Sequence, residues 1–464
     1  MFHEIDDKLH DECGVFGIFM QNPDTMTDAA RTAFYGLYAL QHRGQESAGI
    51  AVADDRHIGL HKGMGLVADV VKPYHIDNLR GHIAIGHVRY STTGGSALVN
   101  AQPLVFHYLK GMVALSYNGN LVNTVELKKR LETYGSVFQT TTDTEVIANL
   151  LARYSQDDLE DALNKAMIDI KGAFALIIMT EDRMLGVRDQ MGIRPLCIGN
   201  LHGDYILASE SAALDTVGAE FVRDVNPGEV VVIDRKGLRS LQVINSPRRA
   251  HCIFEYIYFA RPDSTIDGLN VNQARRELGR QLAREFPIAA DMVIAVPDSG
   301  TAAALGYAEE SGLPFEEGLM KNRYVGRTFI QPTQQMREMG VRLKLNAVAE
   351  VVRGKRLIMI DDSIVRGTTS KKIVQMLRNV GAQEVHMVVS SPPTKFPCYY
   401  GIDTSRREEL IASTMDVDQI CQYIGADSLH YISRAGMFKA LGSEAEIFCD
   451  ACFCGEYPAG AEGK

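Results

Sequence analysis

The sequence has no apolar stretch long enough to cross a membrane. Its longest purely apolar runs, such as Gly172–Met179, are far short of the ~20 residues that a membrane-spanning helix needs. The first residues also lack the apolar core of a signal peptide and are acidic instead, with Glu4, Asp6 and Asp11 among them. We therefore expect no membrane partner and a cytoplasmic location.

An excess of positive charge is missing as well. Lys and Arg total 48 against 58 Asp and Glu, so the net charge is -10, which argues against a broad nucleic-acid-binding surface. Internal repeats and low-complexity tracts are also absent from the sequence. The 464 residues, 46% hydrophobic and 23% charged, exceed what one ordinary core holds and favour about two to four well-packed domains. Nucleic acid is accordingly not an expected partner.

The segment 357–370 carries the strongest chemical signal. Residues 357–360 are apolar and have the length of a buried parallel strand, and Asp361 and Asp362 follow them directly. A turn of small residues at 367–370 then opens a stretch with helical spacing, whose first N–H groups attract a phosphate. Like charges repel, so the two carboxylates should face hydroxyl groups or a metal ion. The segment predicts a sugar-phosphate site, with a plain strand-to-helix turn as the alternative.

The pattern of secondary structure changes near residues 246–249, which read as a linker because a proline and charged residues follow a strand. Beyond the linker, strand and helix alternate, and this predicts a parallel sheet with ligands at the carboxyl ends of its strands. The first half has an α/β pattern without regular alternation. Its expected strands are 15–19, 83–85, 113–116, 174–179 and 230–233, and its expected helices are 29–40 and 145–152. In the second half, strands are expected at 292–296, 357–360 and 385–389.

Segment 357–370 resembles the phosphoribosyl-diphosphate loop of the type I phosphoribosyltransferases, which implies a parallel-sheet domain of that family over residues 246–464. By this resemblance Asp361 and Asp362 bind the ribose hydroxyls and one Mg²⁺ per subunit, with Ser299 as a further ligand of the metal. The resemblance assigns the remaining contacts with phosphoribosyl diphosphate to Ser363, Gly367, Thr368, Thr369 and Ser370.

A basic segment at residues 321–344 stands out in this acidic protein and calls for an anion. It resembles the flexible loop that closes over the sugar diphosphate in proteins of this kind. The resemblance implies that Arg327 binds phosphoribosyl diphosphate, and a solvated basic loop is the alternative.

Polar residues at the ends of apolar segments in the first half could together recognise free glutamine. The zwitterion needs a cation, an anion, donors for an oxyanion and a nucleophile, and the sequence offers Arg89, Asp143, Asn118 with Gly119, and Cys13. A guanidinium can grip a carboxylate with two parallel hydrogen bonds, and each good oxyanion donor stabilises the intermediate by roughly 3–4 kcal/mol. Taken singly, these residues are equally typical of a buried strand start, surface charges and a tight turn.

Together and in this order the residues resemble the class II glutamine amidotransferases, as does the segment 41–45. The resemblance implies an N-terminal-nucleophile hydrolase fold, a four-layer αββα sandwich, over residues 13–245. It makes Cys13 the nucleophile, Asn118 and Gly119 the oxyanion hole, and Arg89 and Asp143 the glutamine-binding pair. It also implies that residues 1–12 are a propeptide, because the base is the α-amine of Cys13, whose pKa of about 7.7–8.0 lies close to the ~8.5 of a thiol.

The combination of α/β and α+β halves resembles the amidophosphoribosyltransferase family over essentially the whole chain from Cys13. The resemblance implies that ammonia from glutamine attacks C1 of 5-phosphoribosyl 1-diphosphate, giving 5-phosphoribosylamine, glutamate and pyrophosphate in the first step of de novo purine synthesis. It also implies purine nucleotide effectors and a homotetramer or other homo-oligomer. Two alternatives remain: a class II amidotransferase with another acceptor, and a non-enzymatic regulator that senses phosphoribosyl diphosphate.

Eight cysteines without a secretion signal suggest metal binding or catalysis before disulfides. One C-x₂-C pair near the C-terminus is by itself equally typical of zinc, redox chemistry and chance. One branch of the amidophosphoribosyltransferases holds a [4Fe–4S] cluster, and four thiolates suit it. The resemblance therefore implies one such cluster per subunit, bound by Cys252, Cys398, Cys449 and Cys452. Cys454 could compete as a ligand, whereas Cys197 and Cys421 are expected in the core.

Overall fold

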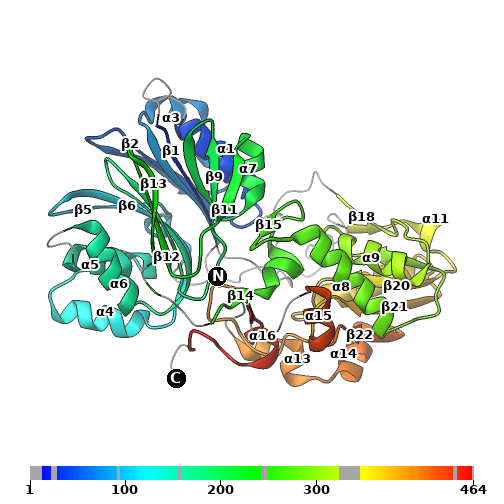
Figure 1. Ribbon diagram of the computed structural model, residues 1–464. Coiled ribbons are helices and arrows are strands. Elements are labelled where there is room, and N and C mark those ends of the chain that lie inside the picture. The colour runs from blue at the N-terminus through cyan, green and yellow to red at the C-terminus, as the bar shows by residue number, and fades with distance from the viewer. Residues whose placement is uncertain are drawn as a thin grey trace.

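The computed structural model describes residues 13–21, 29–90, 95–154, 158–242, 244, 248–322, 345–402, 404, 406–442 and 447–461. Two lobes lie side by side, one built on two large sheets and the other on one smaller sheet (Figure 1). No helix in these parts of the chain is long and apolar enough to cross a membrane.

The first lobe contains two antiparallel sheets packed face to face. The first sheet has the order β11-β9-β10-β1-β4-β2-β3 and the second the order β13-β12-β8-β7-β6-β5. The strands of the first are β1 (Cys13–Phe19), β2 (Ser47–Ala53), β3 (Ile58–Met64), β4 (Ile83–Arg89), β9 (Cys197–Leu201), β10 (Asp204–Ala208) and β11 (Glu220–Asp224). Those of the second are β5 (Leu104–Tyr108), β6 (Gly111–Leu121), β7 (Gly172–Met179), β8 (Met184–Arg188), β12 (Glu229–Asp234) and β13 (Gly237–Gln242).

Successive side chains of a strand point to opposite faces of its sheet, and in this lobe they fill three apolar layers. Val15 of β1 points between the sheets and joins a cluster with Ile177 of β7, whereas Phe16 points outward to the helices. The first sheet is covered by α1 (Ala29–Ala39), α2 (Val67–Val70), α3 (Pro73–Asn78) and α7 (Ser211–Val217), and the second by α4 (Thr124–Thr133), α5 (Asp143–Tyr154) and α6 (Leu159–Asp169). The result is the predicted four-layer αββα sandwich.

Every strand expected from the sequence lies within or overlaps an observed strand, but several strands are longer than predicted. β6 continues through Leu121, so Asn118 and Gly119 lie inside a strand and the tight-turn alternative is wrong. A short 3₁₀ turn at Leu98–Asn100 precedes the second sheet.

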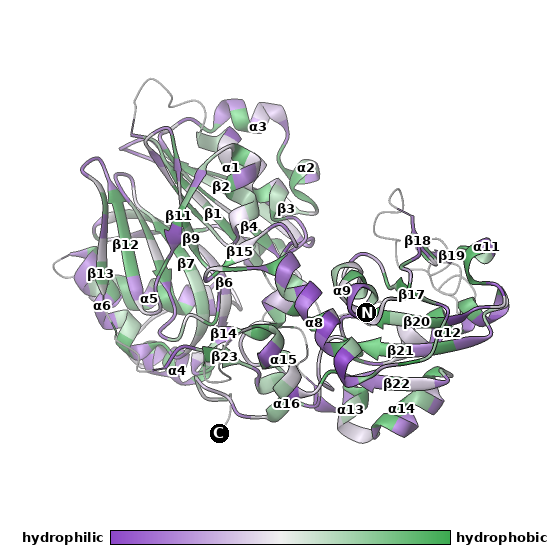
Figure 2. Cartoon of the chain, turned by 45° about the vertical axis from the view of Figure 1, so that its right-hand side comes forward, coloured by the Kyte–Doolittle hydropathy of each residue, from purple (hydrophilic) through white to green (hydrophobic). Residues whose placement is uncertain are grey.

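The second lobe is built on a parallel sheet with the order β17-β20-β21-β22. Its strands are β17 (Met292–Ala295), β20 (Arg356–Asp361), β21 (Glu384–Val389) and β22 (Ser428–Tyr431). One face packs on α8 (Val271–Glu285), α9 (Thr301–Ser311) and α15 (Arg434–Ala440), and the other on α11 (Ala349–Val352), α12 (Thr368–Asn379), α13 (Ile411–Thr414) and α14 (Val417–Ile424). Because both faces are covered, β17, β20 and β21 are apolar along most of their length (Figure 2), whereas the edge strand β22 carries Ser428 and His430.

The order of these strands reverses direction at one point of the sheet. Phe315 bridges Val293 on the side of β17 away from β20, so the chain moves first to one side of β17 and then to the other. Such a reversal is a topological switch point, where ligands bind at the carboxyl ends of the strands. Asp361 ends β20 there, and the loop 297–300 follows β17 at the same edge.

The C-terminal segment returns to the region just after the expected linker. β14 (His251–Cys252) pairs in parallel with β23 (Phe448–Cys449), and Cys252 is the register partner of Cys449. A π-helical turn, η3 (Glu255–Phe259), follows β14, and α16 (Ala451–Cys454) follows β23. The remaining short elements are β15 (Thr265–Ile266), β16 (Leu269–Asn270), β18 (Leu319–Lys321), β19 (Leu345–Ala347) and a 3₁₀ turn at Arg407–Glu409.

Candidate active sites

Cys13 begins β1 and is almost buried at one end of the first sheet. Its register partner on the neighbouring strand β4 is Arg89. Arg89 is itself buried, and its Nη1 donates to Glu46 Oε1 at 2.9 Å. The expected nucleophile and the expected cation for a substrate carboxylate therefore lie on adjacent strands, opposite one another.

Asn118 and Gly119 reach the same region from the second sheet. His87 Nε2 lies 2.9 Å from the carbonyl oxygen of Tyr117, and this contact ties β4, which carries Arg89, to β6, which carries Asn118. The Asn118 side chain is fully buried, and neither of its amide atoms has a hydrogen-bond partner within the described parts of the chain. A buried amide left without a partner costs about 1–3 kcal/mol, so the arrangement is suited to a ligand that supplies the partner.

Gly119 cannot be replaced without moving the backbone of β7. Its φ is +155°, and a Cβ atom built there would lie 2.1 Å from the carbonyl oxygen of Ala173. The glycine therefore lets the two strands approach closely beside Asn118.

Asp143 opens α5 and is buried next to the end of β6. Its Oδ2 accepts a hydrogen bond from the backbone N–H of Leu121 at 3.0 Å. Burial raises the pKa of Asp143 to about 6, against backbone hydrogen bonds that favour the charged form. The Asp143 side chain is therefore a charged carboxylate near neutral pH and becomes protonated in mild acid.

This raised pKa predicts how glutamine affinity depends on pH. Below about pH 6 the Asp143 carboxylate takes up a proton and can no longer pair with an ammonium group, so affinity should fall about tenfold per pH unit. Equilibrium binding of glutamine to a Cys13→Ala variant measures this pH dependence of the affinity without turnover of the substrate. Asp143→Asn should bind weakly and lose this pH dependence, and pH-independent affinity between about pH 5 and pH 7 would contradict the assignment.

The acidic pair of the second lobe, Asp361 and Asp362, lies at the carboxyl end of β20. Asp361 and Asp362 are both buried. Asp362 accepts hydrogen bonds from the Ser363 hydroxyl at 2.6 Å and from the Ser299 hydroxyl in the loop after β17, and its own N–H donates to Asp361 Oδ1 at 2.9 Å. Residues from two strand ends, more than sixty positions apart, thus converge on one carboxylate.

The loop after β17 also carries a charge pair. Lys321, the last residue of β18, places its Nζ 2.6 Å from Asp298 Oδ2. The peptide bond between Pro297 and Asp298 is cis. A lysine is therefore present at the loop that also carries Ser299, a hydrogen-bond partner of Asp362.

The predicted phosphate loop forms the start of α12. Gly367 has φ +76°, a left-handed conformation that suits glycine, and Thr368 is the first helical residue. The first N–H groups of this helix have no partner within the helix and attract an anion. Ser370 is buried in the first turn. Arg327 and its basic neighbours fall at 323–344, outside the described residues, as do residues 1–12, so those two predictions stay predictions.

Four cysteines line one cavity between the lobes. Cys252 and Cys449 are register partners, and Cys398 and Cys452 complete the set of four thiols that line the cavity. Burial raises the pKa of Cys252 to about 12, so its thiolate would need nearby positive charge. Cys454 instead places its Sγ 3.5 Å from Asp450 Oδ1.

The spacing of these thiols does not suit a single metal ion. Within the described ranges, no group of three or more His, Cys, Asp or Glu side chains is placed to hold one ion. A four-iron cluster spreads its ligands further, because each thiolate binds a different iron. All eight cysteines lie in the described ranges and none forms a disulfide; Cys197 is buried in the core as expected, and Cys421 is half-buried on α14.

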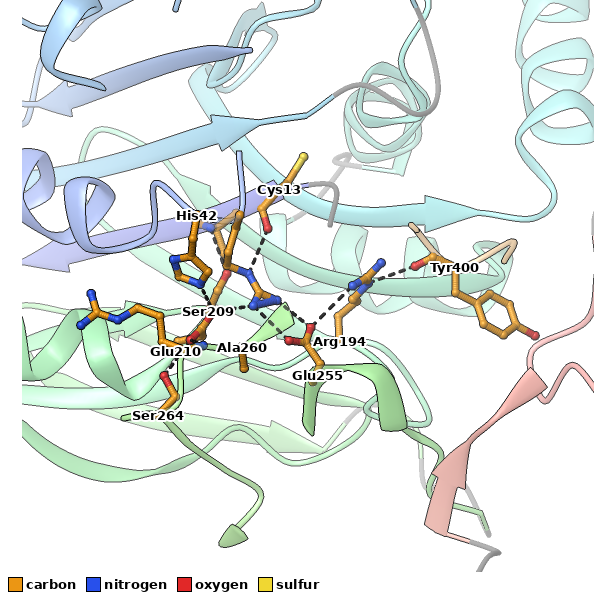
Figure 3. Close-up of polar contacts among 12 residues, drawn as sticks. Cys13, His42, Arg194, Ser209, Glu210, Glu255, Ala260, Ser264 and Tyr400 are labelled. Carbon is orange, nitrogen blue, oxygen red and sulfur yellow. Dashed lines mark hydrogen bonds and ion pairs between the residues drawn. The ribbon is translucent and has the colours of Figure 1, made fainter. Parts of the chain in front are cut away.

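Sequence reasoning missed a buried charge network between the lobes (Figure 3). Arg43, Glu210, Glu255 and Arg194 are each almost fully buried and contact one another. One of these residues, Arg43, belongs to the segment 41–45, which the sequence offers only as a similarity to a family. For Arg194 and Glu255 the available signal was a charged residue between apolar neighbours, whereas Arg43 and Glu210 lack apolar neighbours in the sequence.

The fold and the two sites define a glutamine amidotransferase joined to a phosphoribosyltransferase. Family models agree with this class: a glutamine amidotransferase domain matches residues 73–276 and a phosphoribosyl transferase domain matches residues 266–397.

Curated relatives make the family specific. The chain is 51% identical over 455 residues to the amidophosphoribosyltransferase of Bacillus subtilis, covering 97% of this chain and 94% of that one. It is also 51% identical to the amidophosphoribosyltransferase of Archaeoglobus fulgidus, covering 97% and 99% of the two chains. A solved structure of the glutamine phosphoribosylpyrophosphate amidotransferase from B. subtilis, complexed with ADP and GMP, superimposes with a TM-score of 0.91 at 50% identity, covering 97% and 98%. The chain belongs to the amidophosphoribosyltransferase family, the glutamine-dependent pentosyltransferases of purine biosynthesis.

Proposed function

We propose that Cys13, Arg89, Asn118, Gly119 and Asp143 form the glutaminase site of this chain. The observation that carries the proposal is the buried Asn118 amide, which has no partner among the described residues. Its N–H groups, together with the N–H of Gly119, suit the oxyanion that forms when a thiolate attacks the substrate amide, and each good donor contributes roughly 3–4 kcal/mol.

The two charged residues of the site, Arg89 and Asp143, orient the substrate. Arg89 pairs with the α-carboxylate of glutamine and Asp143 with its α-ammonium. The α-amine of Cys13 takes the proton of the thiol and returns it to the departing ammonia. This requires Cys13 to be the first residue, with 13–245 as the glutaminase domain and 246–464 as the phosphoribosyl domain.

Removal of residues 1–12 is therefore expected in the active enzyme. The intact mass of purified, active protein should correspond to a chain that begins at Cys13. A fully active enzyme that retains Met1 would contradict both the propeptide and the role of the α-amine.

In the second lobe, we propose that Asp361 and Asp362 hold the ribose hydroxyls and that residues 367–370 hold the 5-phosphate, with Ser363 beside them. The carboxylates with the Ser299 hydroxyl offer only oxygen donors, which suits Mg²⁺, an ion commonly bound by one or two carboxylates plus substrate phosphates. One Mg²⁺ per subunit would neutralise the diphosphate as it leaves.

The four-thiol cavity fits the [4Fe–4S] cluster that the sequence predicts. We assign it a structural role, because the thiols come from the segment after the linker, from the loop after β21 and from the C-terminal tail. The purified enzyme should contain about four irons per chain and absorb broadly in the visible range. Cys398→Ser should lose this iron, whereas Cys421→Ser should keep it. A colourless protein that contains zinc would overturn the cluster.

Purine nucleotides are proposed as effectors, since the B. subtilis relative was solved with ADP and GMP. A homotetramer or another homo-oligomer remains the expected assembly.

A further inference from the structure

Glu255 is a buried carboxylate from beyond the linker that contacts the glutaminase lobe. It opens the π-helical turn η3, three residues after Cys252, and its residue is 1% exposed. Its Oε1 accepts from Arg43 Nη2 at 2.6 Å and its Oε2 from Arg43 Nη1 at 3.0 Å. Two parallel bonds of this kind fix the plane of the guanidinium.

The same guanidinium holds the main chain of the nucleophile. Arg43 Nε donates to the carbonyl oxygen of Cys13 at 3.3 Å, and Nη1 also donates to Glu210 Oε1 at 2.5 Å (Figure 3). Each nitrogen of Arg43 is therefore engaged. Because Arg43 cannot turn without breaking buried charged contacts, its orientation is transmitted to the backbone of Cys13.

Neighbouring groups hold Glu255 itself in place. Arg275 of α8 donates from Nε to the carbonyl oxygen of Tyr256 at 3.0 Å and from Nη2 to that of Ala260 at 2.8 Å, which clamps both ends of the π turn. On the other side, Arg194 Nη1 lies 3.6 Å from Glu255 Oε1. The backbone of the turn that carries Glu255 is thus held by α8 of the second lobe, whereas its carboxylate is held by Arg43 and Arg194 of the first lobe.

Glu210 anchors Arg43 from the first lobe. It accepts hydrogen bonds from His42 at 2.7 Å, from the Ser264 hydroxyl at 2.7 Å and from the backbone N–H of Arg261 at 2.9 Å. Burial alone would raise the pKa of Glu210, but the charges of His42 and Arg43 hold it well below its ordinary value.

We propose that Glu255 is a positioning residue for the glutaminase reaction: through Arg43 it fixes the main chain of Cys13 and so sets where the thiol and the α-amine lie. The inference rests on the proposed role of Cys13 as nucleophile. It means that the geometry of the first reaction depends on a carboxylate that lies beyond the last strand of the two large sheets, on the turn η3.

Glu255→Gln keeps the shape and removes the charge. Glutamine-dependent kcat should fall at least about tenfold, because a small misplacement of a reacting group is costly. The KM for glutamine should stay within about twofold, since neither Arg89 nor Asp143 contacts Glu255. The rate at which iodoacetamide alkylates Cys13 should fall, and the dependence of this rate on pH should change. Mass spectrometry of the N-terminal peptide measures the alkylation. Synthesis from supplied ammonia, which bypasses Cys13, should keep its rate.

Glu229→Gln is the matched control, because Glu229 is also buried and doubly bonded to an arginine, Arg223, but contacts neither Arg43 nor Cys13. Its glutamine-dependent kcat and Cys13 alkylation should match those of the unsubstituted enzyme. Equal loss of glutamine- and ammonia-dependent rates in Glu255→Gln, or unchanged alkylation of Cys13, would overturn the proposal and leave a purely structural contact.

Two further measurements keep the test decisive. If Glu255→Gln does not fold, Glu255→Asp retains the charge on a shorter side chain and should lower kcat and Cys13 alkylation together while KM holds; unchanged alkylation would again overturn the proposal. The nucleophile is checked separately by Cys13→Ala in the otherwise unsubstituted chain, so a failure of that assignment is distinguishable from a failure at Glu255.

Discussion

Replacing Cys13 by alanine is expected to abolish glutamine-dependent turnover, by roughly 10⁴-fold or more, because no other group supplies the covalent step. Synthesis from ammonia should continue, since the carboxylates and the helix start of the second lobe lie on other elements. Because the active enzyme is proposed to begin at residue 13, the variant is best produced without residues 1–12. Both rates are measured as pyrophosphate release.

Cys197→Ala is the matched control for that variant. Cys197 is a second buried cysteine of the same sheet, on β9, and both of its activities should be retained. Retention of glutamine-dependent turnover by Cys13→Ala would remove Cys13 as the nucleophile.

Asp362→Asn is expected to abolish both the glutamine-dependent and the ammonia-dependent synthesis. Asp362 is buried and accepts hydrogen bonds from Ser299 and Ser363, so it joins both strand ends that surround the proposed ribose and metal site. Loss of its charge should lower both rates by about 10³-fold, the scale found for removal of a well-placed electrostatic group. Initial rates with glutamine and with ammonia, at saturating phosphoribosyl diphosphate and Mg²⁺, measure the effect.

Asp291→Asn serves as its control, because Asp291 precedes β17 at the opposite edge of the same sheet and pairs with Arg356 at 2.9 Å. This variant should keep both activities. A selective loss of the glutamine-dependent rate in Asp362→Asn would contradict a role in holding the acceptor.

Local patterns predicted the segment 357–370 of the second lobe but not the strand β22 of the same sheet, nor the strand position of Asn118 and Gly119 in the first lobe. The run 357–370 encodes a strand, an acidic pair and a helix start in order, and the structure has them in β20, Asp361 with Asp362, and α12. Asn118 with Gly119 reads locally as a turn, yet pairing with β7 keeps both in a strand, because tertiary context overrides a short-range preference.

Contacts between distant segments were the part that spacing could not predict. Arg43 and Glu255 are 212 residues apart, and the pairing of Cys252 with Cys449 depends on two strands of two residues each. Such contacts are set by how the lobes pack, and no periodicity in either segment records them. Resemblance to a family placed the four cysteines together, and the cavity they line agrees with it.

The most direct test of the whole account is the stoichiometry of products. Glutamate, pyrophosphate and phosphoribosylamine are measured with glutamine and phosphoribosyl diphosphate together, and with each alone. The account predicts equal amounts of glutamate and pyrophosphate when both substrates are present, and no pyrophosphate without a source of ammonia. Two results would contradict this mechanism: pyrophosphate released from phosphoribosyl diphosphate alone, or glutamine consumed without a matching amount of phosphoribosylamine. Either result would mean that the ammonia released from glutamine at Cys13 does not react with the ribose held by Asp361 and Asp362.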